Sequence, residues 1–231
     1  MEGKRLPSQL DIPSPEHERT DSLITLPPLD PVLLPVGSNY TRAARLREEQ
    51  RLRAVERSEL LDSGDEERFD RITRAACRQF GVLTAMVSLI ADDRQYLKSV
   101  MGWHAPHLRD VRNVPRQHAF CNLALQDEQP LVVPDTLADP RFRTSPFVLT
   151  APFVRFYAGV PLRGPGGWFV GSICILDVRP RAFGEAELHQ LLTLAAQAEL
   201  EVNAPGRSGR SARPIHLLAG PFGPTDSTNR R

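Results

Sequence analysis

The sequence predicts an α+β domain, in which an antiparallel β-sheet has helices packed on one face and a ligand cavity on the other. Two strand-like runs, residues 154–162 and 168–177, are joined by RGPGG, whose glycines and proline are typical of a hairpin turn. Polar and apolar residues alternate along both runs, so each strand has one apolar face and one mixed face. Helical patterns at residues 66–80 and 184–202 flank the strands. The apolar sheet face is expected to pack under these helices, and the mixed face to border a pocket.

The composition is that of an ordinary globular protein. The chain has 231 residues, of which 41% are hydrophobic and 25% charged, and its net charge is +1. This balance gives no bulk attraction to nucleic acid or to a membrane surface. No apolar run reaches the about 18 residues of a transmembrane helix, and no apolar segment of a signal peptide follows the N-terminus. The three cysteines are widely spaced, which argues against a disulfide framework and for a cytoplasmic location.

Three segments are expected along the chain. Residues 1–40 are rich in proline and polar residues and predict a disordered arm, although LPPLDPVLLP could dock in extended form on a partner. Residues 41–203 are expected to form one folded domain with helices at both ends. Residues 204–231 are rich in Gly, Pro, Ser and Arg and predict a disordered basic tail.

The folded segment begins with helices and a first strand pair. Arginines and glutamates alternate over residues 41–61, which predicts a solvated or partner-facing helix. The pattern S-x-x-E at Ser63–Glu66 predicts a capping box at the start of a second helix, which Gly81 ends. Strands are expected at residues 83–91 and 95–100, joined by a turn at two aspartates.

A long irregular segment, residues 102–116, is expected to cover the sheet. A short helix with His118, Phe120, Cys121 and Leu125 should follow Pro115. A strand is then expected at residues 130–134, and Asp139–Pro140 predicts a helix start. In the last helix the expected buried stripe is Leu188, Leu191, Leu192, Ala195 and Ala198.

Several motifs in a fixed order resemble the GAF domain of bacterial sensory proteins, as it occurs N-terminal to histidine-kinase or cyclic-dinucleotide output domains. They are VVPDTLADPRF, RFYAGVPL and GSICILD followed by RPR, with LLDSGDEERFDRI, VSLIADDRQYLKS and AFC upstream. The resemblance covers roughly residues 45–203. It implies that the first and last helices pack on one sheet face, and that the other face and the cover segments form the ligand cavity. It names no cofactor or ligand, so both stay unknown.

The resemblance and the residues together indicate a non-catalytic sensory module that signals to a partner protein, such as a histidine kinase. Related proteins commonly dimerise through their terminal helices, so a homodimer through residues 42–61 and 184–203 is expected. One alternative is a redox enzyme or redox sensor that uses Cys121 with His118, which share a helical face. A second alternative is a ligand-free dimerisation scaffold. The family's methionine sulfoxide reductases place several cysteines in a different local pattern, and its pigment-binding branches usually pair the cysteine with an adjacent histidine, where Asn122 stands here.

A metal site is also weighed, since His104, His107, His118 and Cys121 lie close in sequence. The pattern lacks the paired ligands of a zinc site, so no metal is expected.

The cavity is expected between the sheet face that carries both polar and apolar side chains and the segments that cover this face. Its expected ligand-binding residues are Phe120, Cys121, Asp135, Phe147, Arg155, Tyr157, Ser172 and Cys174. Arg155 and Tyr157 are the preferred polar contacts, because a buried arginine requires a partner. Two structural interpretations also stay open: Arg141 pairs with Asp135 or Asp139 to brace the loop, or Arg155 pairs with an internal carboxylate such as Asp135 or Asp177.

Overall fold

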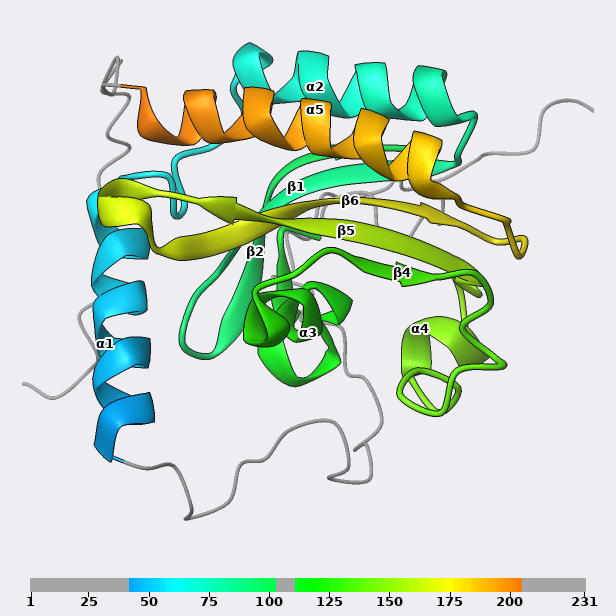
Figure 1. Ribbon diagram of the computed structural model, residues 1–231, viewed down its shortest axis with the longest axis horizontal. Helices are drawn as coiled ribbons and strands as arrows, with labels where there is room; N and C mark the ends of the chain where they lie inside the picture. The colour runs from blue at the N-terminus through cyan, green and yellow to red at the C-terminus, as the bar shows by residue number, and fades with distance from the viewer. Residues whose placement is uncertain (1–41, 103–110, 205–231) are drawn as a thin grey trace, which may run out of the picture.

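The computed structural model describes residues 42–102 and 111–204, which form a single sheet with helices on both faces (Figure 1). The sheet is antiparallel throughout, in the order β3-β2-β1-β6-β5-β4. Its described strands are β1 (Thr84–Ile90), β2 (Arg94–Met101), β3 (Asn113–Pro115), β4 (Leu131–Val133), β5 (Phe156–Arg163) and β6 (Phe169–Asp177). The predicted α+β fold class is confirmed. The expected N-terminal arm, the basic tail and the middle of the cover loop lie outside the described residues.

Two layers of helices enclose the sheet (Figure 1). The described helices are α1 (Arg42–Arg57), α2 (Glu67–Phe80), α3 (Phe120–Asp127), α4 (Pro146–Leu149) and α5 (Glu185–Asn203), with short 3₁₀ turns η3 (Arg116–His118) and η4 (Pro165–Gly167). Helices α2 and α5 lie side by side over one sheet face and form the helix layer. The cover layer on the other face comprises η3, α3 and residues 134–154 with α4. None of the described helices is both long and apolar enough to cross a membrane.

The predicted hairpin is present as β5 and β6. Ala158 pairs with Ile175 and Val160 with Ile173, and all four side chains belong to the buried cluster under α2 and α5. The strand begins at Phe156 rather than at residue 154. Val154 already belongs to the cluster beneath the cover layer. From Phe156 onward the predicted alternation assigned the two faces of the hairpin correctly. It was wrong for Val154 and Arg155, which precede the strand.

The helix layer differs from the expectation in its first member. Helix α2, not the helix at residues 42–57, lies beside α5 over the sheet, while α1 stands at the end of the sheet (Figure 1). Helix α1 adds only Ala54 and Val55 to the apolar cluster of this layer. In α5 the predicted Leu192 is 40% exposed. Leu194 is buried instead, because the buried face follows spacings of three and four residues through Leu191, Leu194, Ala195, Ala198 and Val202.

The predicted capping box of α2 is absent. Glu66 is the N-cap in an extended conformation, without a side-chain cap. The buried ammonium of Lys98 explains this, because it donates to Ser63 Oγ (2.5 Å) and pairs with Glu66 (2.6 Å). A buried charge needs close acceptors more than a helix end needs a cap. Gly81 ends α2 with φ +57°, as predicted.

The predicted helix start at Asp139–Pro140 is wrong, and β3 was not expected. The carboxylate of Asp139 instead accepts from the backbone N–H of Arg141 (2.9 Å) and pairs with its guanidinium (2.7 Å). This local pairing closes a turn. The helix of this segment begins only at Pro146.

Candidate functional site

The two faces of the sheet differ in polarity, as the alternation predicted. The cover-facing side chains of the central strands include Met86, Ser88, Tyr157, Ser172 and Cys174. Phe120, Cys121 and Phe147 lie in the same buried cluster, from α3 and α4. The structure thus brings together six of the eight predicted site residues. Their role in ligand binding stays a prediction.

A small cavity lies between the sheet and the cover layer. Its volume is about 30 Å³. Its lining comprises Met86, Gln95, Leu97, Val114, His118, Ala119, Phe120, Cys121, Phe147, Val154, Tyr157, Cys174 and Leu176. A volume of this order holds about one water molecule, whereas pockets for drug-sized ligands measure roughly 300–1,000 Å³. In this closed form the cavity has room for a water-sized molecule only, and a ligand of a few heavy atoms requires α3 to move away from the sheet.

Two thiols meet at the cavity. Cys121 Sγ on α3 lies 3.6 Å from Cys174 Sγ on β6, and both residues are buried. The side-chain amide of Gln95 donates to Cys121 Sγ (3.2 Å) and to Ser88 Oγ (2.8 Å). The hydrogen bond with Cys174 lowers the pKa of Cys121 against the opposing effect of burial. The same hydrogen bond, with burial, raises the pKa of Cys174. The amide donor of Gln95, which reaches Cys121 Sγ, favours ionisation of Cys121 over Cys174.

Tyr157 is the largest polar side chain of the cavity. Its ring lies edge-on to Phe120 (5.6 Å between centroids) and nearly parallel to Phe142 (6.4 Å). Its hydroxyl is buried and has no nitrogen or oxygen partner in hydrogen-bond geometry among the described residues, so that its polar neighbour is the Cys121 thiol. Burial raises the pKa of Tyr157. A Cβ at Gly159 would lie 2.2 Å from this hydroxyl oxygen. Only glycine at 159 leaves room for the observed position of the ring.

His118 lines the cavity but does not pair with Cys121. Its Nε2 lies 3.3 Å from the side-chain nitrogen of Gln117, while Nδ1 is buried without a partner among the described residues. Burial lowers the pKa of His118. Gln95 and Cys174 lie within hydrogen-bond distance of Cys121 Sγ, and Ser172, Tyr157 and Ser88 also affect its pKa, whereas His118 does not. The described contacts therefore give no support to the Cys121–His118 pair of the redox alternative.

Arg155 and Asp135 lie outside this cavity. They form a bidentate ion pair, with Arg155 Nε and NH2 at 2.9 and 2.8 Å from the two oxygens of Asp135. Their side chains are 31% and 30% exposed. The pair braces the entry to β5, where Thr136 N–H donates to the carbonyl of Arg155. Of the readings of Asp135, the pairing with Arg155 is the one observed.

Gln95 was missed by the sequence analysis. It lies opposite Ile90 in the β1–β2 pair, and its side chain reaches Ser88 and Cys121 beneath the cover layer. The parity of β2 could have identified it, since Gln95 and Leu97 alternate with Tyr96. From the sequence alone, a glutamine near the start of a strand is expected to be exposed. Its burial depends on α3, which begins 25 residues further along the chain.

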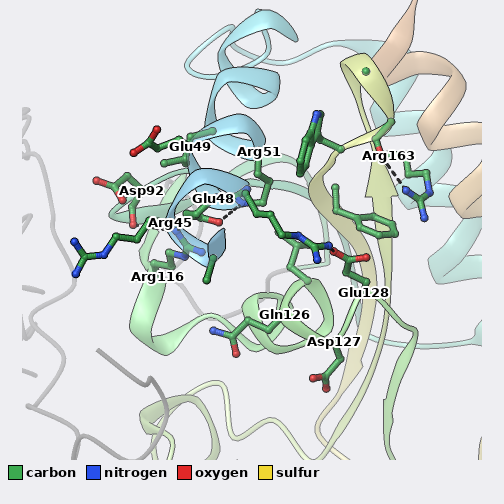
Figure 2. Close-up of a pocket in the computed structure, with 18 of the residues that line it drawn as sticks. Arg45, Glu48, Glu49, Arg51, Asp92, Arg116, Gln126, Asp127, Glu128 and Arg163 are labelled. Atoms are coloured by element: carbon green, nitrogen blue, oxygen red, sulfur yellow. Dashed lines mark hydrogen bonds and ion pairs between the residues drawn. The ribbon is translucent and has the colours of Figure 1, made fainter. Parts of the chain in front are cut away.

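An ion-pair network joins the cover layer to α1 (Figure 2). Arg116 donates to Asn122 Oδ1 on α3 (2.9 Å) and to Glu48 Oε1 on α1 (2.7 Å). Arg51 binds the same carboxylate and the carbonyl of Ile90 (2.7 Å each). Burial opposes the ionisation of Glu48, but hydrogen bonds from Arg51 and Arg116 outweigh it and lower the pKa to about 2. The side chain of Arg116 thus links α1 and α3.

The same network borders an open groove of about 1,520 Å³ between α1, the end of α3 and η4 (Figure 2). Arg47 on α1 pairs across it with Glu128 (2.9 Å). Cationic and anionic side chains alternate along the groove, among them Arg45, Glu49, Asp127 and Arg163. Because the signs are mixed, the groove has no single charge with which to select a ligand.

Metal ligands do not cluster in the part of the chain that the structure describes: no group of three or more His, Cys, Asp or Glu side chains there could hold an ion. His104 and His107, which the sequence analysis weighed, lie outside the described residues.

An antiparallel sheet with a helix layer on one face and a covered cavity on the other is an α+β architecture. The family model of the GAF domain matches residues 66–202. The chain belongs to the GAF domain family.

A cyclic di-GMP phosphodiesterase of Pseudomonas aeruginosa is 36% identical over 134 residues, which are 58% of this chain and 22% of that protein. The chain thus spans less than a quarter of the length of this relative. Among solved structures, the GAF domain of an Acinetobacter phosphoenolpyruvate-protein phosphotransferase is 18% identical, with a TM-score of 0.48 over 66% of this chain and 92% of that one. A free methionine-R-sulfoxide reductase from Neisseria meningitidis is also 18% identical, with a TM-score of 0.48 over 71% and 92%.

Proposed function

We propose that this chain is a non-catalytic, cytoplasmic sensory module that binds a molecule of a few heavy atoms beneath α3. The observation behind the proposal is a group of buried polar atoms without partners among the described residues: Tyr157 hydroxyl, Ser172 Oγ and His118 Nδ1. Leaving such an atom unpaired costs about 1–3 kcal/mol. A small polar molecule in the adjoining cavity would offset this cost.

The route of the signal runs from α3 to α1. A molecule that repositions α3 would displace Asn122, which holds Arg116. Arg116 holds the carboxylate of Glu48 on α1. Because the carboxylate stays ionised down to about pH 2, the connection persists through the physiological range. The ligand would thus shift the population of α1 positions seen by a partner.

The partner would be an output protein such as a histidine kinase, or an output domain of cyclic-dinucleotide metabolism. The relative named as a cyclic di-GMP phosphodiesterase supports the second, because the matched segment is a minor part of that protein. In this proposal the present chain supplies regulation and the output element supplies the chemistry.

Native mass spectrometry of freshly purified protein tests the binding function. We expect an added mass that is lost on denaturation. The variant Tyr157→Phe/Ser172→Ala removes two of the unpaired hydroxyls and should lose the added mass while keeping the circular dichroism of the wild type. The bare mass of the chain in the wild-type preparation would contradict ligand binding and favour the scaffold alternative.

The scaffold alternative has one observation of its own. Leu192 and Leu200, 40% and 74% exposed, lie on the outward side of α5 together with exposed Ala196. Residues spaced by four form one apolar stripe along a helix. A homodimer through α5 would bury this stripe. Sedimentation velocity should show a dimer that Leu200→Glu dissociates, and a monomer at high concentration of the wild type would exclude it.

A further inference from the structure

The two buried thiols of the cavity have a geometry that goes beyond ligand binding. Their sulfur atoms are 3.6 Å apart, although the two residues are 53 positions apart in the chain, and neither cysteine forms a disulfide. We propose that Cys121 and Cys174 are a redox modification site, at which a hydroperoxide converts the two thiols into a reversible intramolecular disulfide.

The distance to be closed is small. A disulfide bond measures about 2.05 Å, so the sulfurs must approach by roughly 1.5 Å. Cys174 is fixed within the sheet, because it is paired with Met86 on one side and Gly159 on the other. Cys121 lies on α3, an eight-residue helix that is attached by side-chain packing. The approach therefore requires a shift of α3 toward the sheet, and the cavity beside the thiols provides space for side chains to adjust.

The surroundings assign different roles to the two thiols. Gln95 Nε2 donates to Cys121 Sγ, and such a donor stabilises a thiolate. The lowered pKa of Cys121 and the raised pKa of Cys174 agree with this assignment. Cys121 is accordingly the sulfur that is oxidised first, and Cys174 resolves it. Cys77, on α2 under the opposite sheet face, donates to the carbonyl of Met101 at 3.8 Å and takes no part.

The reaction balances in two steps. The Cys121 thiolate attacks one peroxide oxygen, the O–O bond breaks, and the other oxygen leaves with a proton as water or an alcohol, so that Cys121 becomes a sulfenic acid. Cys174 sulfur then attacks Cys121 sulfur, the S–S bond forms and the S–O bond breaks. The departing hydroxide takes the Cys174 proton as water. Two electrons and two hydrogens pass from the thiols to the peroxide.

The experiment treats the folded, reduced full chain with hydrogen peroxide, quenches the reaction, denatures the protein and alkylates it with iodoacetamide. Before oxidation the three cysteines should all be alkylated. Afterwards only Cys77 should be, and peptide mapping should show Cys121 joined to Cys174 within one chain. Dithiothreitol should restore all three sites. Three alkylated cysteines after peroxide would overturn the proposal, as would disulfides between chains alone.

Matched variants separate the roles. Cys77→Ser should oxidise like the wild type, with no cysteine left for alkylation. Cys174→Ser should stop at a Cys121 sulfenic acid that reacts with dimedone. If Cys174→Ser does not fold, the peptide map of the wild type still decides the question. Faster oxidation of Cys77 than of Cys121, or a disulfide that forms only in denaturant, would each contradict a site built for oxidation in the native state.

Discussion

The two faces of the sheet bury comparable apolar clusters but treat polar groups differently. Under α2 and α5, Tyr96 hydroxyl accepts from Gly64 N–H, Lys98 is fully paired, and Thr73 and Ser99 bond each other. Under the cover layer, buried Tyr157, Ser172, His118 and Ser145 each have a side-chain atom without a partner among the described residues.

This difference in the pairing of buried polar groups indicates that the two layers have different roles. A buried polar group that is paired costs little, while an unpaired one costs about 1–3 kcal/mol. Proteins commonly give up stability in this way where a site is needed. The helix layer therefore contributes stability, and the cover layer contains the site.

The largest loss of stability should come from the helix layer. Phe69 on α2 is fully buried and has the cations of Arg68 and Lys98 against its ring, at 4.9 and 5.5 Å from the centroid. Phe69→Ala should lower the free energy of unfolding by about 3–5 kcal/mol, because it leaves a cavity in a close-packed core. Urea denaturation measures this. The control Gln197→Ala, on exposed α5 surface, should change it by less than about 0.5 kcal/mol. A loss below about 1 kcal/mol for Phe69→Ala would contradict the contrast.

Periodicity explains how much of this architecture the sequence could predict. Patterns within an element located α2, α5 and the β5–β6 hairpin and most of their buried residues, Leu192 being an exception, because the alternation and the helical stripe indicate which side is buried. These patterns failed where the local structure depends on a residue that is distant in the sequence. Lys98 takes the acceptors that a capping box at Ser63–Glu66 would have used.

The candidate site shows the same limit. Parity placed Ser88, Tyr157, Ser172 and Cys174 beneath the cover, but it also placed Arg155 there. Arg155 precedes the strand and finds Asp135 at the sheet edge. The burial of Gln95 and the approach of Cys121 to Cys174 depend on how α3 packs on the sheet, and no local pattern records that packing.

The next largest loss of stability should come from a substitution in the cover layer, at Gly159. A Cβ there would lie 2.2 Å from the Tyr157 hydroxyl oxygen and 2.7 Å from its Cζ. Gly159→Ala should therefore lower the free energy of unfolding by about 1–3 kcal/mol, as overpacking does. In the background Tyr157→Phe the closest atom is gone, so the same substitution should cost less. Urea denaturation of the four proteins of this double-mutant cycle measures the coupling, and equal costs in the two backgrounds would contradict the clash.

The network between α1 and α3 predicts a smaller, pH-dependent effect. Glu48→Gln removes a carboxylate that Arg51 and Arg116 share, and should cost about 1–2 kcal/mol at neutral pH. The folded pKa of about 2 lies below the ordinary 4.5. The contribution of Glu48 is therefore complete above pH 4.5 and is lost as the pH falls toward 2.

Stability curves of the wild type and Glu48→Gln should accordingly converge over that range. Glu49→Gln changes an exposed neighbour on α1 and serves as the control, with a curve parallel to that of the wild type. A difference between the wild type and Glu48→Gln that stays constant down to pH 2 would show that Glu48 keeps no special connection to the arginines.

The smallest expected changes in stability compare the two sheet faces most directly, because the same substitution, tyrosine to phenylalanine, is made on each face. Tyr96→Phe removes a hydroxyl that accepts from Gly64 N–H (3.3 Å) and should cost about 0.5–1.5 kcal/mol in urea denaturation. Tyr157→Phe removes a buried hydroxyl that no described group pairs with, so in protein shown by native mass spectrometry to be ligand-free it should be neutral or stabilise by up to about 1 kcal/mol. A loss of stability for Tyr96→Phe, together with no loss or a gain for Tyr157→Phe, would support the proposal that the cover layer gives up stability for a site. Equal losses at Tyr157 and Tyr96 would mean that the Tyr157 hydroxyl is as well satisfied as its counterpart, and the proposed division between the faces would fail.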